Sequence, residues 1–208
     1  HEVQSLFRTP VDIAFICTKS YDTEWATMMI RQYLAPDGFV VSLQNSINEE
    51  RIASIVGWGR VLGCIASTIG VDAREAGHVM RTQKPGGSAY TVFRVGEVHG
   101  SITGRTEEIV RLLNHVDSAK PTTNLWGERW SKLTTNSMGN GISAATGMTG
   151  KEVVEWEVSR RLSIRLGAEA VKVGQALGYK LENIRGLPPQ TWLAAGEGNG
   201  TALEEVEN

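Results

Sequence analysis

The chain has 208 residues, of which 41% are hydrophobic and 21% are charged, enough for one or two globular domains with a buried core. Its formal net charge of -2 provides no basic field to attract nucleic acid or an anionic membrane. No apolar run reaches the ~18–20 residues that span a bilayer, and residues 1–10 lack the apolar core of a signal peptide. We therefore expect a cytoplasmic protein that binds neither nucleic acid nor membrane.

The two cysteines, Cys17 and Cys64, each lie within an apolar run. No CxxC motif or paired Cys/His spacing of the kind that binds zinc occurs. We expect two buried, free thiols in a reducing cytosol, and no metal site.

Three short apolar runs, at residues 11–18, 39–43 and 60–68, predict buried parallel strands. A helix that Pro36-Asp37-Gly38 ends is predicted between the first two, and another from about Asn48 to Val56 between the second and third. The apolar positions of the first helix are Trp25, Met28, Met29 and Leu34. This alternation of strands and helices indicates a parallel sheet with right-handed crossovers.

The pattern changes at Lys84-Pro-Gly-Gly-Ser88, a turn sequence between residues 78–83 and 89–95. These two segments are expected to pair as an antiparallel hairpin. A helix over 103–116 follows, and the polar segment 117–124 is interpreted as a domain boundary. It separates an α/β domain, residues 1–120, from a helical domain, residues 121–208.

Two long helices, over 125–142 and 151–177, are predicted in the second domain because both segments lack proline. Pro188-Pro189 opens a further short helix, and Gly196–Gly200 is expected to form a flexible loop. The predicted fold class is therefore α/β followed by the beginning of an all-α domain.

No Gly-rich turn that would hold the pyrophosphate of a dinucleotide follows the first predicted strand. The segment Gly57–Gly63 precedes a strand and has the wrong spacing, and Gly150-Lys151 is followed by Glu152 where a Walker loop needs Ser or Thr. The chain also begins at His1 without an initiator Met and ends in an acidic run. We expect both ends to be cut and the phosphate cradle to lie outside this sequence.

Polar residues follow the first two predicted strands, at Lys19-Ser20 and at Gln44-Asn45-Ser46. Ligands of open parallel sheets bind outside the carboxyl ends of the strands, so Lys19 and Asn45 are candidates for a cofactor crevice. The alternative is that these residues only cap helices and form turns, as Asn and Ser often do.

A stripe of polar residues runs along the helix predicted over 125–142: Lys132, Asn136 and Asn140 recur every four residues and share one face. Gly139 and Gly141 each cost this helix about 1 kcal/mol relative to Ala, which is tolerated where a ligand or backbone comes close. A solvated Lys/Asn face is the alternative, although such faces more often carry Glu and Lys.

These residue types suit the reduction of a ketone. Hydride transfer to a carbonyl produces an alkoxide, which needs a proton donor and positive charge at its oxygen, and a partly desolvated Lys132 supplies both. Asn side chains hold a hydroxyl or a carboxylate in register without adding charge.

Three segments give the sequence a resemblance to the ketopantoate reductase family. Residues 15–23 (FICTKSYDT) resemble its strand that ends in Lys, and residues 42–50 (SLQNSINEE) resemble its LQNG segment. Residues 130–140 (WSKLTTNSMGN) resemble its W-x-K-L-x-x-N-x-x-x-N helix. The resemblance extends from about residue 11 to 180 and is most specific in the third segment.

The resemblance implies the C-terminal part of a Rossmann-like domain followed by the start of a 6-phosphogluconate-dehydrogenase-like helical domain, which binds substrate and is a possible dimerisation domain. It implies NADPH as cofactor and a 2-keto acid, 2-dehydropantoate, as substrate. Lys132 is then the general acid, Asn136 and Asn140 bind substrate, and Lys19 and Asn45 lie near the nicotinamide ribose and substrate. A homodimer is possible.

Two departures from the family pattern stand out. Ser46 occupies a position where the family usually has Gly, and the N-terminal GxGxxG unit and the C-terminal segment with a substrate-binding Ser and Glu have no counterpart. We therefore expect the isolated fragment to be inactive. Two alternatives stay open: a related reductase of another keto or imino acid, and a catalytically silent, protein-binding relative.

Overall fold

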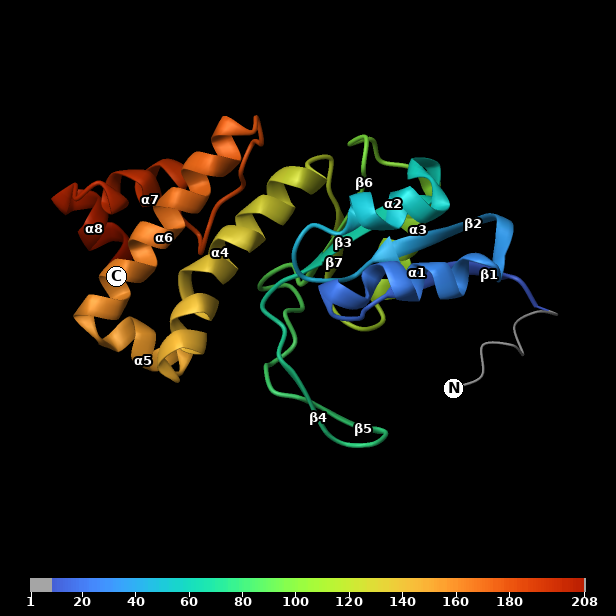
Figure 1. The fold of residues 1–208 in the computed structure, drawn as a ribbon, viewed down its shortest axis with the longest axis horizontal. Helices are drawn as coiled ribbons and strands as arrows, with labels where there is room; N and C mark the ends of the chain where they lie inside the picture. Colours follow the sequence, from blue (N-terminus) through green and yellow to red (C-terminus); the bar gives the residue numbers. More distant parts are fainter. Residues whose placement is uncertain (1–8, 208) are drawn as a thin grey trace. The chain divides into compact units, whose positions relative to one another are not determined.

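The computed structural model describes residues 9–207, coloured in Figure 1. The chain forms two compact units, His1–Leu125 and Trp126–Asn208, which are described separately. The first unit is α/β and the second is helical, so the predicted order of fold classes is confirmed. Among the described residues, no helix combines the length and the apolar character that crossing a bilayer requires.

The first unit is built on a five-stranded sheet with the strand order β1-β2-β3-β6-β7. Its strands are β1 (Val11–Ile16), β2 (Leu34–Ser42), β3 (Val61–Ala66), β6 (Phe93–Glu97) and β7 (Ala119–Pro121). Strands β1, β2 and β3 are parallel neighbours, β6 is antiparallel to β3, and β7 is parallel to β6. The predicted parallel β-α-β-α-β succession is therefore confirmed.

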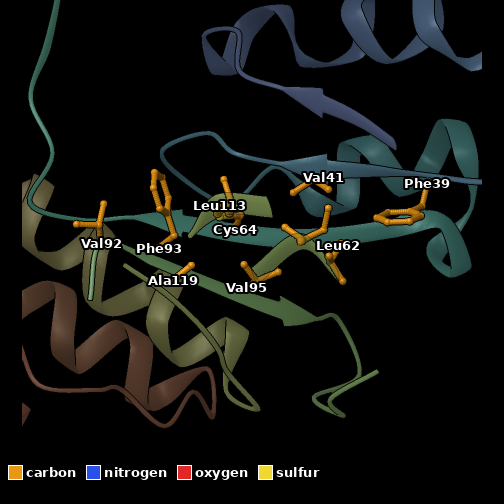
Figure 2. Packing of buried hydrophobic residues seen from close by; sticks show 10 residues of the cluster. Phe39, Val41, Leu62, Cys64, Val92, Phe93, Val95, Leu113 and Ala119 are labelled. Atoms are coloured by element: carbon orange, nitrogen blue, oxygen red, sulfur yellow. The ribbon is translucent and has the colours of Figure 1, made fainter. Parts of the chain in front are cut away.

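Helices α1 (Thr23–Arg31), α2 (Glu49–Val56) and α3 (Gly104–Leu113) cover this sheet, and short 3-10 turns occur at Ser20–Asp22 and Trp58–Arg60. Successive residues of β2 face opposite sides of the sheet. Val40 packs with Ile52 of α2, whereas Val41 packs with Ile109 of α3 (Figure 2 shows Val41 in this second cluster). Both valines are fully buried, which contributes about 1.5–3 kcal/mol each. Burial on both faces explains the continuous apolar runs of the sequence.

The prediction for α1 is wrong at its C-terminal end. The helix ends at Arg31, and Leu34 belongs to β2. Trp25 and Met28 are exposed, whereas the buried residues of this helix are small: Thr23, Ala26 and Thr27. The Pro36-Asp37-Gly38 segment lies within β2, where the pairing register with β1 shifts. A Cβ at Gly38 would lie 2.6 Å from the carbonyl oxygen of Val11, so this close approach requires glycine.

The predicted hairpin is also wrong. The antiparallel hairpin is formed by β4 (Val71–Glu75) and β5 (His78–Arg81), which reverse at Gly77 with a φ of 78°. The segment expected to pair with residues 78–83 instead supplies β6, because the buried Val92, Phe93 and Val95 join the core of the main sheet (Figure 2). Figure 1 shows β4 and β5 extending away from that sheet.

The turn sequence at residues 84–88 forms a loop that the side chain of Asp117 holds in place. Its buried carboxylate accepts hydrogen bonds from the backbone N–H groups of Gly86 and Gly87 at 3.0–3.1 Å and pairs with Arg81. Burial alone would raise the pKa of Asp117, but the hydrogen bonds from Gly86 and Arg81 hold it well below its usual range. The segment 117–124 is therefore not only a polar linker, since it holds this turn and contains β7.

The second unit contains α4 (Leu125–Thr146, which begins at the last residue of the first unit), α5 (Gly150–Glu155), α6 (Glu157–Ala176), α7 (Pro189–Gly196) and α8 (Gly200–Glu207). Its core cluster includes Met138, Ile164, Val171, Ile184 and Trp192. The short helix opened by the proline pair is confirmed as α7. The loop expected at Gly196–Gly200 is present but shorter, at residues 197–199, because Gly196 ends α7 and Gly200 begins α8.

The single helix predicted over 151–177 is wrong, because the chain breaks it at Trp156, whose ψ of 123° is extended. The Ser159 hydroxyl donates to the carbonyl oxygens of Val153 and Trp156 at 2.9 and 3.0 Å, and so provides a partner for the Val153 carbonyl at the end of α5. Both cysteines are free, as predicted, but only Cys64 is buried, because Cys17 is exposed.

Replacing Gly174 with alanine is expected to lower the free energy of unfolding by about 1–3 kcal/mol, a typical cost of overpacking. A Cβ there would overlap the indole of Trp130, which donates to the carbonyl oxygen of Ala170 at 2.8 Å and stacks on Tyr179. Helix propensity alone would favour the substitution by about 1 kcal/mol. Thermal or urea unfolding measures the sign, with Gly141→Ala as the control because nothing lies within 4 Å of its Cβ. A Gly174→Ala protein as stable as that control would contradict this packing.

Candidate active site

Lys19 and Asn45 follow β1 and β2, which are parallel neighbours with Ile16 paired to Ser42. The last backbone bond between them runs from Leu43 N to the carbonyl oxygen of Ile16 at 3.0 Å. Both candidate side chains are exposed, and neither makes a hydrogen bond or ion pair with another residue in the described part of the chain. The structure therefore brings these two residues to the carboxyl edge of the sheet with their polar atoms available.

Gln44 is buried between the two strand-end loops. Its amide Nε2 donates to the carbonyl oxygen of Thr18 at 2.8 Å and to the hydroxyl of Thr23 at 2.9 Å. The Thr23 hydroxyl in turn donates to the carbonyl oxygen of Ser20 at 2.8 Å. Lys19 thus lies between two backbone positions that side chains hold in place.

Ser46 has a φ of 73°, in the left-handed region that favours glycine. A non-glycine residue costs roughly 1–2 kcal/mol there. This conformation gives a physical reason for the glycine that the family resemblance led us to expect at this position. Strain of this kind concentrates at ligand-binding loops, where the surrounding structure maintains it.

The second group of candidates lies on α4. Lys132, Asn136 and Asn140 follow one another along one face of this continuous helix, the first two half-buried and the third exposed. The neighbouring hydroxyls are occupied within the helix: those of Thr134 and Thr135 donate to the carbonyl oxygens four residues earlier, at 3.0 and 3.1 Å. The three candidate side chains make no hydrogen bond or ion pair with another described residue.

Lys132 is the ionisable group of this stripe. Burial lowers the pKa of its ammonium below the usual value. Among residues 9–207 no carboxylate forms an ion pair with it that would restore the pKa. A lysine in this state gives up a proton more readily than a solvated one, as a general acid must.

The helix that carries Lys132 is firmly anchored in its unit. The hydroxyl of Ser131 accepts from the backbone N–H of Glu182 at 2.8 Å and donates to the same residue's carbonyl oxygen at 3.0 Å. Trp130 packs against Tyr179, and Met138 is buried in the core cluster. Anchors before and after Lys132 and Asn136 preorganise this face of the helix.

Each group of residues fits part of a carbonyl-reduction site. The exposed amide and ammonium at the sheet edge are suited to hydroxyl groups such as those of a nicotinamide ribose, whereas the α4 stripe offers a proton donor and two neutral amides. No Gly-rich turn opens α1 to hold a pyrophosphate; residues 19–22 occupy that place. Within the described ranges no cluster of His, Cys, Asp or Glu is suited to a metal ion.

Two polar residues with a role at the sheet edge, Gln44 and Asn48, were not among the candidates predicted from the sequence, although Gln44 belongs to the polar segment after the second strand. Asn48 lies just before α2, where an asparagine is normally interpreted as a helix cap. Its amide instead donates to the carbonyl oxygen of Asn45 at 2.9 Å. That bond is local, but the same amide also donates to the hydroxyl of Ser20, 28 residues earlier, at 3.1 Å, and only the fold identifies this second bond.

Comparison with known proteins gives matches over most of the chain. The family "Ketopantoate reductase PanE/ApbA" matches residues 2–92, and its C-terminal counterpart, "Ketopantoate reductase PanE/ApbA C terminal", matches residues 124–195. The first match falls in the α/β unit, and the second begins at its last two residues and covers most of the helical unit.

Solved structures share this fold at low sequence identity. A 2-dehydropantoate 2-reductase from Geobacter metallireducens GS-15 is 22% identical with a TM-score of 0.67, over 95% of this chain and 76% of its own. A PanE/ApbA family ketopantoate reductase from Ralstonia eutropha JMP134 is 22% identical with a TM-score of 0.70, over 93% and 65%. A D-mandelate dehydrogenase in complex with NADH is 15% identical with a TM-score of 0.73, over 93% and 62%.

The chain therefore spans 62% to 76% of the length of these three structures. The α/β unit followed by helices is their shared architecture, and the two family matches cover both of its parts. The chain belongs to the ketopantoate reductase PanE/ApbA family.

Proposed function

We propose that the protein reduces a 2-keto acid, 2-dehydropantoate, to its 2-hydroxy product with NADPH, and that Lys132 is the general acid. The observation that carries this proposal is the half-buried Lys132 with its lowered pKa and no ion-pair partner among the described residues. Family membership supplies the reaction type. Residues 1–120 are proposed to bind the cofactor and residues 121–208 the substrate.

A dinucleotide held by Lys19 and Asn45 would supply the hydride that the keto carbon takes up. As the carbonyl becomes an alkoxide, the Lys132 ammonium stabilises the negative charge and gives its proton to that oxygen, which completes the hydroxyl. Lys132 is left neutral and regains a proton from solvent before the next turnover. Hydride and proton together account for the two hydrogens that the product gains.

Asn136 and Asn140 are proposed to orient the substrate, because neutral amides bind a carboxylate or a hydroxyl without changing the charge near Lys132. Lys19 and Asn45 are proposed to bind the ribose of the nicotinamide and the adjoining part of the substrate. Both residues have free side chains at the carboxyl edge of parallel strands, where dinucleotides bind in sheets of this kind.

A titration of NADPH with the protein, in the length that its gene encodes, tests this proposal. The nicotinamide fluorescence should change in a saturable manner, and NADPH should bind more tightly than NADH. The family resemblance supports the 2′-phosphorylated cofactor, whereas the D-mandelate dehydrogenase structure was determined with NADH. No fluorescence response to either dinucleotide would favour a silent, protein-binding relative instead.

Replacing Asn136 with alanine is expected to raise the KM for the keto acid about tenfold, with a smaller effect on kcat, because a substrate-orienting hydrogen bond contributes about 1–1.5 kcal/mol. Asn136 is half-buried and one helical turn from Lys132. Steady-state kinetics measures both constants. Ser137→Ala is the control, since its hydroxyl only donates to the carbonyl oxygen of Thr134. An unaltered KM would return Asn136 to a structural role.

Reduction of a different 2-keto acid is the second candidate. The similarity to D-mandelate dehydrogenase, which a further solved structure contains together with NADH and anilino(oxo)acetate, favours an aryl-substituted substrate. The ratio of kcat/KM for 2-dehydropantoate to that for an aryl 2-keto acid separates the two. A ratio well below one would identify the aryl 2-keto acid as the better substrate, with the same type of reaction.

A further inference from the structure

The backbone does not by itself hold the loops that carry Lys19 and Asn45. Beyond the bond from Leu43 to Ile16, strand pairing ends and the chain turns into α1 on one side and α2 on the other. Beyond that point, the hydrogen bonds between the loop after β1 and the loop after β2 are made by side chains, those of Ser20, Thr23, Gln44, Asn48 and Arg51. The geometry of this edge therefore depends on those side chains.

Two of these side chains, Gln44 and Asn48, are buried amides. Gln44 holds the loop after β1, as described above, by donating to the carbonyl oxygen of Thr18, the residue before Lys19. The Asn48 amide donates both to the hydroxyl of Ser20, at 3.1 Å, and to the carbonyl oxygen of Asn45, at 2.9 Å. Each amide thus links a residue beside one candidate to the opposite loop.

The bonds of Asn48 are not those of a helix cap. Asn48 occupies the N-cap position of α2, yet its side chain accepts no bond from the first turn of that helix. It is also almost completely buried, with 2% of its surface exposed. A residue whose local role would be capping therefore has both of its donor bonds directed to the loops of the sheet edge.

We propose that the Gln44 and Asn48 amides form a clamp, defined by these two residues, that positions Lys19 and Asn45 for binding the dinucleotide. The proposal rests on the proposed function, in which those two residues bind the nicotinamide ribose. The clamp holds the backbone directly before Lys19 and at Asn45, so the loops are ordered before the ligand arrives. Loops that are already ordered lose little conformational entropy when the ligand binds, so the affinity is higher.

The substitution Asn48→Ser separates positioning from folding. Serine is as good an N-cap as asparagine and adds no charge, so α2 should retain its stability. Its short side chain does not span the distance to Ser20 and Asn45. Ser54→Ala is the matched control on the same helix, because the Ser54 hydroxyl is exposed and donates only to the carbonyl oxygen of Arg51.

We expect Asn48→Ser to weaken NADPH binding about five- to tenfold, the effect of losing a hydrogen bond worth about 1–1.5 kcal/mol. The melting temperature should fall by only a few degrees relative to Ser54→Ala, because Asn48→Ser removes hydrogen bonds within the folded protein. Hydrogen–deuterium exchange should quicken at residues 17–23 and 43–48 only. The double variant with Ser20→Ala should weaken binding by less than the product of the two single effects, since both residues share one hydrogen bond.

The outcomes separate this inference from the proposed function. If the unaltered protein binds NADPH and Asn48→Ser binds it equally well, the clamp does not position the cofactor residues and the inference is overturned. If the unaltered protein binds no NADPH, the proposed function fails. Hydrogen–deuterium exchange of Asn48→Ser then tests whether the clamp orders the two loops. Faster exchange in both loops would then support it, and unchanged exchange would refute it.

Discussion

Replacing Lys132 with alanine is expected to lower kcat about 100- to 10,000-fold, the usual contribution of a positioned general acid, while the affinity for NADPH stays nearly unchanged. Lys132 is half-buried on α4, and burial lowers the pKa of its ammonium. Alanine removes both the proton and the positive charge at the developing alkoxide. Steady-state kinetics with 2-dehydropantoate and a fluorescence titration with NADPH measure the two quantities independently.

Lys132→Arg is the matched control, because arginine keeps the charge but does not release a proton at accessible pH. It should recover little of the lost kcat. In the unaltered enzyme the general acid must be protonated, so kcat should fall as the pH rises through the pKa of Lys132. That pKa is below 10.5, the usual value for lysine. If Lys132→Ala reduced 2-dehydropantoate with a kcat close to that of the unaltered enzyme, Lys132 would not be the general acid.

Replacing Arg105 with alanine is expected to lower the free energy of unfolding by about 3–5 kcal/mol, because it leaves a buried carboxylate without its partner. Glu97 is completely buried, and Arg105 donates to its two oxygens at 2.7 and 2.5 Å. Arg105 also donates to the carbonyl oxygen of Gly59 at 2.7 Å and lies 5.4 Å from the ring centre of Phe39. Urea unfolding measures the loss.

The pH dependence of this pair has a definite sign. Burial is the largest influence on Glu97 and opposes its ionisation, but the hydrogen bonds from Arg105 and Thr103 and the charge of Arg105 together outweigh it and lower the pKa. A lowered pKa in the folded state stabilises the protein above the pKa of the unfolded state, and this contribution is lost as the pH falls through the folded value. Acid unfolding of Arg105→Ala should therefore start at higher pH than that of the unaltered protein.

Arg111→Ala serves as the control, since Arg111 pairs with Glu108 at 3.9 Å with both side chains largely exposed. A pair of this kind contributes little, about 0–1 kcal/mol. Glu97 pairs with Leu62 near the start of β3, whereas Lys19 and Asn45 follow the other end of the parallel strands. Arg105→Ala should consequently leave NADPH affinity unchanged where the protein is folded. Equal stability of the two variants would contradict the assigned role.

The sequence predicted the elements whose signal is local. Strands β1 to β3 are buried on both faces and so appear as continuous apolar runs. The hairpin was mispredicted because turn residues indicate a reversal without specifying which segments pair. Gly77 makes the reversal between β4 and β5, while Gly86 belongs to a loop held by Asp117, 31 residues further along the chain. The break at Trp156 has no glycine or proline to mark it.

In the candidate site, too, some features follow from the local sequence and others depend on contacts between distant residues. The α4 stripe follows from helical spacing alone, but the burial that lowers the pKa of Lys132 depends on tertiary packing. Asn48 bonds to Ser20, 28 residues away, and the sequence around it is that of an ordinary helix start. Assignment of roles to Lys19, Asn45, Asn136 and Asn140 stays a prediction.

The most direct test of the proposed reaction is to mix the protein, in the length that its gene encodes, with NADPH and 2-dehydropantoate and to follow both nicotinamide oxidation and product formation. We predict that one NADPH is oxidised for each 2-hydroxy acid formed, and that Lys132→Ala abolishes both while still binding NADPH. Absence of turnover with NADPH bound, or equal turnover by Lys132→Ala, would contradict a Lys132-dependent keto acid reductase.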